Sequence, residues 1–222
     1  REPLKPFELP PQNDNMRRVY AYLLNRRGID REVLSAFVHK GMIYESADYH
    51  NAVFVGYDEH SIARHAHKRG TGSESTYKGN AESCDPRYSF HWTGTDNILY
   101  LFEAPIDMLS FISLHKENWR SHSYAAACCV GDQVLFQMLK ANPNIDTVCL
   151  CMDNDTAGQA ANKRISDKLF IQGIKHEILV PEFKDWNEDR LAAGGNAPHI
   201  RAEFSLPQEE SEEKEICQTL QL

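Results

Sequence analysis

The strongest constraint on the fold is an alternation of strand-like and helix-like segments from residue 98 onward. Apolar runs typical of buried strands occupy residues 98–103, 123–131, 147–153 and 176–180. Segments with helical periodicity separate them, at residues 105–116, 132–141 and 156–173. Strands that alternate with helices of this length predict a parallel sheet covered by helices on both faces. We therefore expect an α/β domain over residues 96–200.

The first half of the chain predicts a small α+β subdomain over residues 13–95. One helix is expected from Asn13 or Asp14 to about Arg27, and a second from Asp30 to Gly41, each with a polar cap and a glycine stop. The period then changes to two at 51–57 and 61–67, which predicts a hairpin. Residues 70–97 predict a loop, the Pro-rich residues 1–12 a linker, and residues 201–222 an acidic tail.

Composition restricts the class of protein. The 222 residues are 41% hydrophobic, which is enough for a sizeable core. No uninterrupted apolar run reaches the roughly 18 residues that a membrane span needs, and no signal peptide is evident, so we expect no contact with a membrane. The chain does not begin with Met, which favours a segment of a longer protein. None of the six cysteines forms a C-x-x-C pair, so reduced thiols in a cytoplasmic protein are expected.

Acidic side chains follow the expected strands. Glu103 ends the first strand, Asp107 lies one helical turn later, Asp153 and Asp155 end the third strand, and Asp185 follows the fourth. Because the carboxyl ends of parallel strands share one edge, these groups are expected to converge there. Converging carboxylates raise one another's pKa and cost stability, unless a divalent cation lies among them. The pattern therefore predicts a site for Mg²⁺ or Mn²⁺, made by Glu103, Asp107, Asp153, Asp155 and Asp185.

The pair Asp153 and Asp155 allows other interpretations, some of which the spacing of neighbouring residues excludes. Taken alone, the pair is more often structural than catalytic, since Asp155 or Thr156 can cap the following helix. A calcium-binding EF-hand loop requires oxygen ligands at the positions of Ala157 and Arg164, so it fails. A phosphatase of the haloacid dehalogenase type usually has Thr at the position of Ala157, and it leaves Glu103 without a role. No P-loop and no dinucleotide-binding glycine motif is present.

The N-terminal half carries a cluster of basic residues. Residues 1–95 hold 13 Lys and Arg against 12 Asp and Glu, whereas residues 96–206 hold 10 against 15. In a strand over 61–67 and beyond, side chains alternate between faces, so Arg64 and Lys68 lie on one face and His67 and Arg69 on the other. We predict that Arg64, His67, Lys68, Arg69 and Lys78 bind the phosphates of a nucleic acid or nucleotide, with aromatic side chains such as Tyr77 stacking on unpaired bases. An ordinary solvated hairpin explains this run equally well.

A possible zinc site in this half has little support. His65, His67, Cys84 and His91 are candidate ligands, but their spacing matches no common zinc module.

Several motifs, in this order, resemble the Toprim domain. They are "EAPID" at 103–107, "CCVG" at 128–131, "MDNDTAGQAA" at 152–161 and "PEFKDWNE" at 181–188. The last is similar to the primase branch of Toprim proteins, and "YLLNRRGIDREVLSAF" at 22–37 and "YKGN" at 77–80 are similar to the segment that precedes the Toprim sheet in bacterial-type primases. Among these proteins the chain most resembles stand-alone Toprim-like proteins of bacterial mobile elements.

The resemblance implies roles for individual residues. Glu103 would be a general acid or base or a metal ligand, Asp153 and Asp155 would bind Mg²⁺, and Asp107 and Asp185 would assist. Gly131 would let a phosphate approach the backbone. Primases often carry a further Asp where this chain has Asn187.

The function implied is metal-dependent phosphoryl transfer on nucleic acid in DNA replication. We expect a nucleotidyltransferase that makes RNA primers on single-stranded DNA from nucleoside triphosphates, with a helicase or another replication protein as a partner. The alternatives are a Toprim nuclease, which would use water as nucleophile, and an inactive nucleic-acid-binding module of a mobile element.

Overall fold

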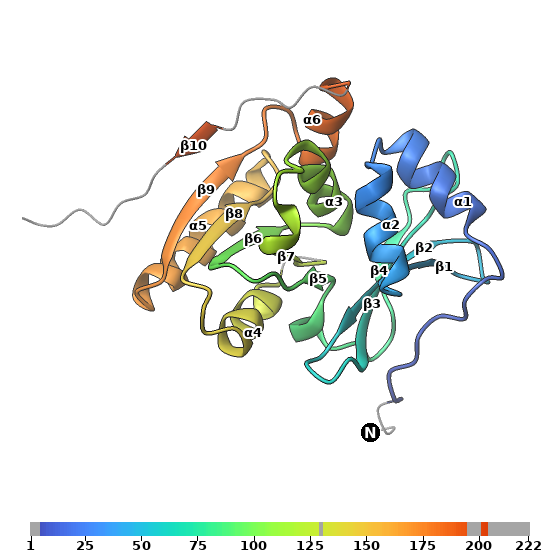
Figure 1. The fold of residues 1–222 in the computed structure, drawn as a ribbon, viewed down its shortest axis with the longest axis horizontal. Helices are drawn as coiled ribbons and strands as arrows, with labels where there is room; N and C mark the ends of the chain where they lie inside the picture. The colour runs from blue at the N-terminus through green and yellow to red at the C-terminus, as the bar shows by residue number, and fades with distance from the viewer. Residues whose placement is uncertain (1–4, 129–130, 195–200, 204–222) are drawn as a thin grey trace, which may run out of the picture.

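A six-stranded sheet forms the C-terminal part of the molecule (Figure 1). The computed structural model describes residues 5–128 and 131–194, and the backbone of 201–203. Strand order in this sheet is β10-β9-β8-β6-β7-β5. The strands are β5 His91–Trp92, β6 Ile98–Phe102, β7 Ser123–Ala126, β8 Thr147–Cys151, β9 Lys175–Val180 and β10 Arg201–Glu203.

Pairing in the sheet is parallel at its centre and antiparallel at its edges. The pairs β7–β6, β6–β8 and β8–β9 are parallel, as the alternating pattern predicted. The edge strands β5 and β10 are antiparallel to their neighbours. Neither was predicted, because two or three residues are too few to show a period. The strand expected over 123–131 ends at Ala126, and of the expected tail only β10 is described.

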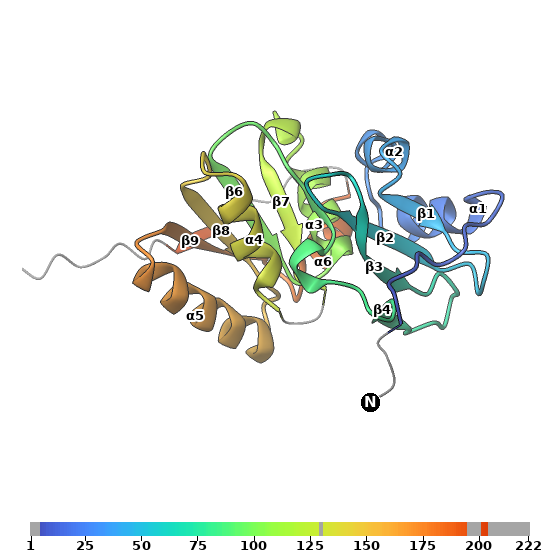
Figure 2. The same cartoon turned by 90° about the horizontal axis from the view of Figure 1, so that it is seen from below.

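Helices cover both faces of this sheet. α3 (Pro105–Leu114) and α6 (Trp186–Ala192) lie together on one face, where their apolar side chains share a core with Phe102 and Cys151. α4 (Gln133–Ala141) and α5 (Thr156–Ile171) cover the other face, against Leu101 and Leu150. Figure 2 shows α4 and α5 side by side along the sheet. Helix α6 was not predicted from the sequence.

The N-terminal part contains a four-stranded antiparallel sheet rather than an isolated hairpin. Its order is β1-β2-β3-β4, with β1 Ile43–Glu45, β2 Ala52–Tyr57, β3 Ala63–Arg69 and β4 Lys78–Asn80. The prediction of a loop over 70–97 was therefore wrong for β4, for β5 and for the 3-10 helix η2 at Pro86–Tyr88. β4 is held by backbone pairing with β3, and such pairing needs no apolar side-chain pattern.

Two helical segments precede and flank this sheet. The first is α1 (Arg17–Tyr20), which continues as the π-helix η1 (Ala21–Arg26), and the second is α2 (Arg31–His39). Asp30 caps α2 as predicted, since its carboxylate accepts hydrogen bonds from the backbone of Glu32 and Val33. The predicted cap of the first helix was wrong.

The buried carboxylate of Glu45 caps the first helix instead. It accepts hydrogen bonds from the backbone N–H groups of Arg18 (3.0 Å) and Val19 (3.2 Å). The free N–H groups of a helix start thus find an acceptor on strand β1, which is distant in sequence.

One continuous core joins the two parts of the chain. Phe37 of α2 packs on Phe90 (5.3 Å between ring centroids) and on Trp119 (5.8 Å), and the same core includes residues of α3 and α6. Phe7, in the segment predicted as a linker, packs on the outer face of the N-terminal sheet. Within the described residues, no helix combines the length and the apolar character that crossing a bilayer requires.

Candidate active site

Four of the five predicted metal-binding carboxylates line one cavity of about 370 Å³. They are Glu103 after β6, Asp107 in the first turn of α3, Asp153 after β8, and Asp185 at the start of α6. The cavity lies at the carboxyl ends of parallel strands, which is where the topology predicts a site. Residues of the N-terminal sheet, including Phe54, close its other side.

Local packing explains why these side chains reach one place. The Asp185 side chain caps α6 by accepting a hydrogen bond from the Glu188 backbone (2.8 Å). The indole N–H of Trp186 donates to the carbonyl of Cys151 (2.9 Å), so α6 is fixed to the end of β8. At Gly158, a Cβ would lie 2.0 Å from the Asp153 carbonyl oxygen. Glycine there lets α5 begin directly against the end of β8.

The electrostatics of the cavity disfavour several negative charges at once. Burial, together with Glu103 and Asp185, raises the pKa of Asp153 from 3.8 to about 7. Burial and then Asp155 raise the pKa of Glu103. Asp107 is 6% exposed, and burial followed by Asp153 raises its pKa well above the usual value. The acids therefore hold protons more tightly than free carboxyl groups, as expected for like charges gathered away from water.

The donor set fits a magnesium ion that keeps part of its water shell. Among the described residues, no three or more His, Cys, Asp or Glu side chains are grouped so as to hold an ion by themselves. The buried Oδ1 atom of Asp153, however, has no hydrogen-bond partner. Mg²⁺ is usually bound by one or two carboxylates, with water and phosphate oxygens as its other ligands. The side chains therefore do not form a closed metal cage, but they offer the oxygen ligands that such an ion uses.

Asp155 has the structural role that the sequence left open. Its Oδ1 atom accepts hydrogen bonds from the backbone of Ala157 (3.0 Å) and Gly158 (2.9 Å), so Asp155 is the N-cap of α5. It does not line the acidic cavity, although it is close enough to Glu103 to raise that residue's pKa. The place of Asp155 among the metal ligands stays a prediction.

Cations line the same cavity as the carboxylates. They come from both parts of the chain: Arg27, Arg69, Lys78 and Lys184. The hydroxyl of Tyr22 accepts hydrogen bonds from the Nε atoms of Arg27 (3.0 Å) and Arg69 (3.3 Å), which brings two guanidinium groups close together. Lys184 was not predicted to bind phosphate. Arg27 belongs to "NRRG" and Lys184 precedes Asp185, but nothing local in the sequence places them in a cavity.

The remaining predicted phosphate-binding residues lie elsewhere. Arg64 forms an ion pair with Asp58 (2.7 Å), outside the acidic cavity. Lys68 lies on the opposite face of β3, with its Nζ atom 5.8 Å from the centre of the Tyr77 ring. Gly131 does not line the cavity, and a Cβ there would meet only the Gln133 side chain.

His67 also lines the acidic cavity. Its Nδ1 atom lies 2.7 Å from Asn80 Oδ1, while the Asn80 side-chain amide donates to the Cys128 carbonyl (2.9 Å). Because that carbonyl can only accept, the Asn80 oxygen must face His67, and Nδ1 carries the proton. Burial lowers the pKa of His67. Asn80, the last residue of "YKGN", thus fixes the tautomer of His67 and joins β4 to the end of β7.

Asn187, where the primase pattern has Asp, makes three hydrogen bonds. Its side chain donates to the Arg27 carbonyl (2.8 Å) and to Ser110 Oγ (3.0 Å) and accepts from Arg27 Nη1 (3.0 Å). An aspartate cannot make the two donations. In this chain the residue therefore positions Arg27 at the acidic cavity.

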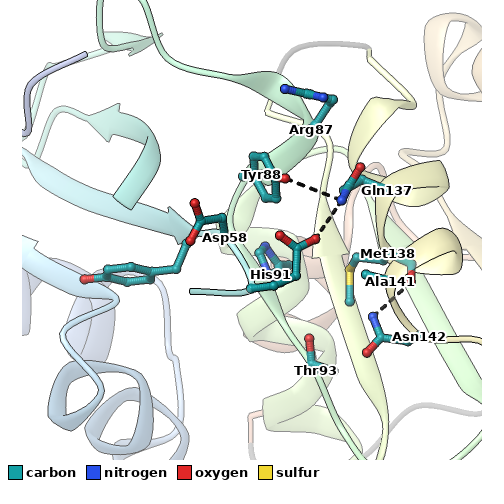
Figure 3. Close-up of a pocket in the computed structure, with 11 residues that line it drawn as sticks. Asp58, Arg87, Tyr88, His91, Thr93, Gln137, Met138, Ala141 and Asn142 are labelled. Atoms are coloured by element: carbon teal, nitrogen blue, oxygen red, sulfur yellow. Dashed lines mark hydrogen bonds between the residues drawn. The ribbon is translucent and has the colours of Figure 1, made fainter. Parts of the chain in front are cut away.

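A second cavity of about 360 Å³ lies apart from the acidic one (Figure 3). It is formed by the β2–β3 turn, η2, β5 and α4, and it shares no lining residue with the acidic cavity. Gln137 bridges its walls by donating to Glu59 (2.7 Å) and to the Tyr88 hydroxyl (3.5 Å). This cavity has no cluster of carboxylates facing a cluster of cations.

Comparison with known families agrees with this fold. The model of the "Toprim-like" family matches residues 100–190, and the model of a family described as a protein of unknown function (DUF3991) matches residues 21–96. Residues 100–190 therefore form a Toprim-like domain, and the fold of the chain resembles the catalytic cores of DNA primases.

Individual relatives extend the comparison. An uncharacterised protein of Bacillus anthracis is 31% identical over 197 residues, which cover 78% of this chain and 56% of that protein. The chain thus spans little more than half the length of this curated relative. The primase fragment of the bacteriophage T7 primase-helicase protein superimposes with a TM-score of 0.58 at 18% identity, over 77% of this chain and 69% of that one. The RNA polymerase domain of the Mycobacterium tuberculosis primase DnaG gives 0.55 at 13% identity, over 83% and 74%. At these identities the likeness concerns the fold.

Proposed function

We propose that this protein catalyses metal-dependent nucleotidyl transfer on nucleic acid, in the form of RNA primer synthesis on single-stranded DNA. The observation that carries the proposal is the presence of both kinds of charge in one cavity. Four carboxylates and four cations line the same cavity, at the carboxyl edge of a Toprim sheet. A polyphosphate with its divalent ion is a ligand that satisfies both sets of charges at once.

The carboxylates of the cavity suit a metal ion bound to a nucleotide. Asp153 is the best-placed ligand, because its buried Oδ1 atom has no hydrogen-bond partner. Among the acids of the cavity, Glu103 contributes most to the raised pKa of Asp153. When bound, Mg²⁺ or Mn²⁺ would neutralise these acids and polarise a phosphate for attack. Burial raises the pKa of Asp107 well above its usual value, which favours the protonated form that can donate a hydrogen bond.

The cations of the cavity suit the phosphates. Arg27 and Arg69 repel each other across the Tyr22 hydroxyl, and an anion bound between them would remove that cost. Lys78 and Lys184 add positive charge, which offsets part of the rise in the pKa of Glu103. These residues would bind and orient a triphosphate while the 3′-hydroxyl oxygen of a growing strand bonds to its α-phosphorus. The bond from that phosphorus to the bridging oxygen would break, pyrophosphate would leave, and the hydroxyl proton would pass to a base, for which Glu103 is the candidate.

A relative supports the choice of substrate. In one solved complex the T7 lagging-strand DNA polymerase interacts with primase domains, and the assembly is bound to an RNA/DNA hybrid and dTTP; the matched chain has a TM-score of 0.58 to this chain at 18% identity. We extend this substrate class to the present chain on the strength of its own cavity. A helicase or another replication protein as a partner is part of the same proposal.

The proposal is tested by incubating the protein with a single-stranded template, labelled nucleoside triphosphates and Mg²⁺ or Mn²⁺. Labelled oligonucleotides are expected from the wild type. Glu103→Gln and Asp153→Asn should lower the yield by about 10²-fold or more, which is the effect of losing one electrostatic group at the reacting phosphate. Glu117→Gln, an exposed acid after α3, is the matched control and should leave the yield unchanged.

Other outcomes favour the alternatives. Shortening of DNA without nucleoside triphosphates, lost in Glu103→Gln, would indicate a nuclease that uses the same acids with water as nucleophile. Binding of DNA with neither synthesis nor cleavage would indicate an inactive nucleic-acid-binding module. Either result would refute primer synthesis.

A further inference from the structure

A groove on the outer face of the N-terminal sheet is separate from the acidic cavity. It has a volume of about 570 Å³, and its lining includes Arg18, Tyr49, Lys68, Gly70 and Tyr77. We propose that this groove binds the unpaired bases of a single-stranded nucleic acid, which then crosses the β4 edge into the acidic cavity. The crossing rests on the proposed function, whereas the binding by the groove does not.

Tyr49 is held in an unusual position. The residue is 88% exposed and lies in the turn between β1 and β2. Both Tyr49 (φ 59°) and His50 (φ 51°) adopt the left-handed conformation, which a bulky side chain adopts only at a cost. Glycine or asparagine would fit this turn with less strain. A large aromatic side chain kept in solvent at such a position indicates that the ring is used for contact.

Hydrogen bonds to neighbouring side chains fix the turn that carries Tyr49. His50 Nδ1 lies 2.7 Å from the buried carboxylate of Glu45, and the Thr71 hydroxyl donates to the His50 carbonyl (2.8 Å). Asn51 and Ser46 close the turn through two hydrogen bonds. These hydrogen bonds hold the backbone of the turn in one conformation. Little conformational entropy is therefore lost when a base stacks on the Tyr49 ring.

The groove combines aromatic rings with positive charge. The Tyr77 ring is 46% exposed, with the Lys68 ammonium 5.8 Å from its centre, and Arg18 lies on the same lining. Asp48 is the one acid in this lining. Exposed rings next to cations are the arrangement that binds single strands, because every base has a face to stack and every nucleotide a phosphate to neutralise.

Strand alternation connects the groove to the acidic cavity. On β3, Lys68 lines the groove while its neighbours His67 and Arg69 line the cavity. On β4, Tyr77 just before the strand lines the groove, and Lys78 at its start lines the cavity. Because β4 is the edge strand of this sheet, a bound strand can pass over it from one face to the other.

Binding is tested by fluorescence anisotropy with a labelled oligo(dT) of about 12 nucleotides, within the range of site sizes for single-strand binding. Tyr49→Ala is expected to raise Kd about 5- to 100-fold, which corresponds to one lost stacking contact. Tyr49→Phe keeps the ring and should bind as the wild type. Phe170→Ala is the control, because Phe170 is exposed (62%) on α5, and it should have no effect.

Tyr49→Gly separates binding from stability. Glycine adopts φ 59° without strain, so this variant should melt at the same temperature as the wild type or higher, yet bind as weakly as Tyr49→Ala. Unchanged Kd in both Tyr49→Gly and Tyr77→Ala, or equal affinity for duplex DNA in the wild type, would overturn the proposed groove.

The crossing has its own test. Lys78→Ala should weaken the binding of an oligonucleotide of about 12 nucleotides, but not of one of about 4 nucleotides, which occupies only the groove. Tyr49→Ala should weaken the binding of both. An equal effect of Lys78→Ala on the two lengths would overturn the crossing. None of these assays needs catalysis, so a protein that makes no primers but shows these differences would refute the proposed function and leave the groove in place.

Discussion

Replacement of Asp153 by Asn should stabilise the protein at alkaline pH. In the folded protein the Asp153 pKa is about 7, against 3.8 for a free side chain, because burial and three neighbouring acids disfavour its charge. A group whose pKa is raised by folding favours the folded state at low pH, and this contribution is lost as the pH rises through the folded pKa. The penalty therefore grows between about pH 4 and pH 7.

The size of the effect follows from the same pKa. Each pKa unit corresponds to about 1.36 kcal/mol, so a rise from 3.8 to about 7 would amount to about 4 kcal/mol for a fully buried group. Asp153 is only partly buried, and solvent screens its charge. We therefore expect Asp153→Asn to be more stable than the wild type by about 1–2 kcal/mol at pH 8, with no difference near pH 4.

Urea unfolding followed by tryptophan fluorescence measures this difference at a series of pH values, with metal removed by chelation. The comparison of variant with wild type cancels the titration of other groups, such as His65, whose pKa burial lowers to about 4. Asp14→Asn, at an exposed position, is the control. Added Mg²⁺ should stabilise the wild type at pH 8 but not Asp153→Asn. A variant less stable than the wild type at pH 8, or a difference that does not change with pH, would refute the reasoning.

Two further substitutions test the packing around the cavity by urea unfolding. Gly158→Ala places a methyl group 2.0 Å from the Asp153 carbonyl oxygen, so we expect the free energy of unfolding to fall by about 1–3 kcal/mol or more. Ala160→Ser, on the exposed side of the same helix, is the control and should leave stability unchanged. Unchanged stability of Gly158→Ala would mean that α5 is free to move away from β8. Asn187→Asp removes the donations to Ser110 and to the Arg27 carbonyl and should cost about 1–3 kcal/mol, and a stability equal to the wild type would show that those hydrogen bonds are not needed.

Helices and strands were predictable from the sequence wherever the element was long enough to show a regular spacing of apolar residues. The central strands β6, β8 and β9 and the helices α3, α4 and α5 follow runs whose apolar spacing was clear in the sequence. β4, β5 and β10, with two or three residues each, show no such spacing. They exist because a neighbouring strand supplies backbone hydrogen bonds, and that neighbour is known only from the tertiary structure.

The candidate site divides in the same way. The order of Glu103, Asp153 and Asp185 along alternating strands was sufficient to predict that acids gather at one sheet edge, since topology places the carboxyl ends of parallel strands together. Whether Asp155 points at the cavity or caps α5 depended on a rotation of one side chain. The structure uses it as the cap, because two free N–H groups at the helix start lie within reach.

By itself the sequence determined the class of fold, the edge of the sheet that carries the acids, and the alternation of basic side chains on β3, because all three follow from the periods of strands and helices. Only the tertiary structure decided that Arg27 and Lys184 belong to the cavity and that Arg64 and Lys68 do not. It also decided that Tyr49 stands in solvent on a strained turn. These placements depend on how the N-terminal sheet packs against the Toprim sheet, and such long-range contacts leave no periodic trace in the chain.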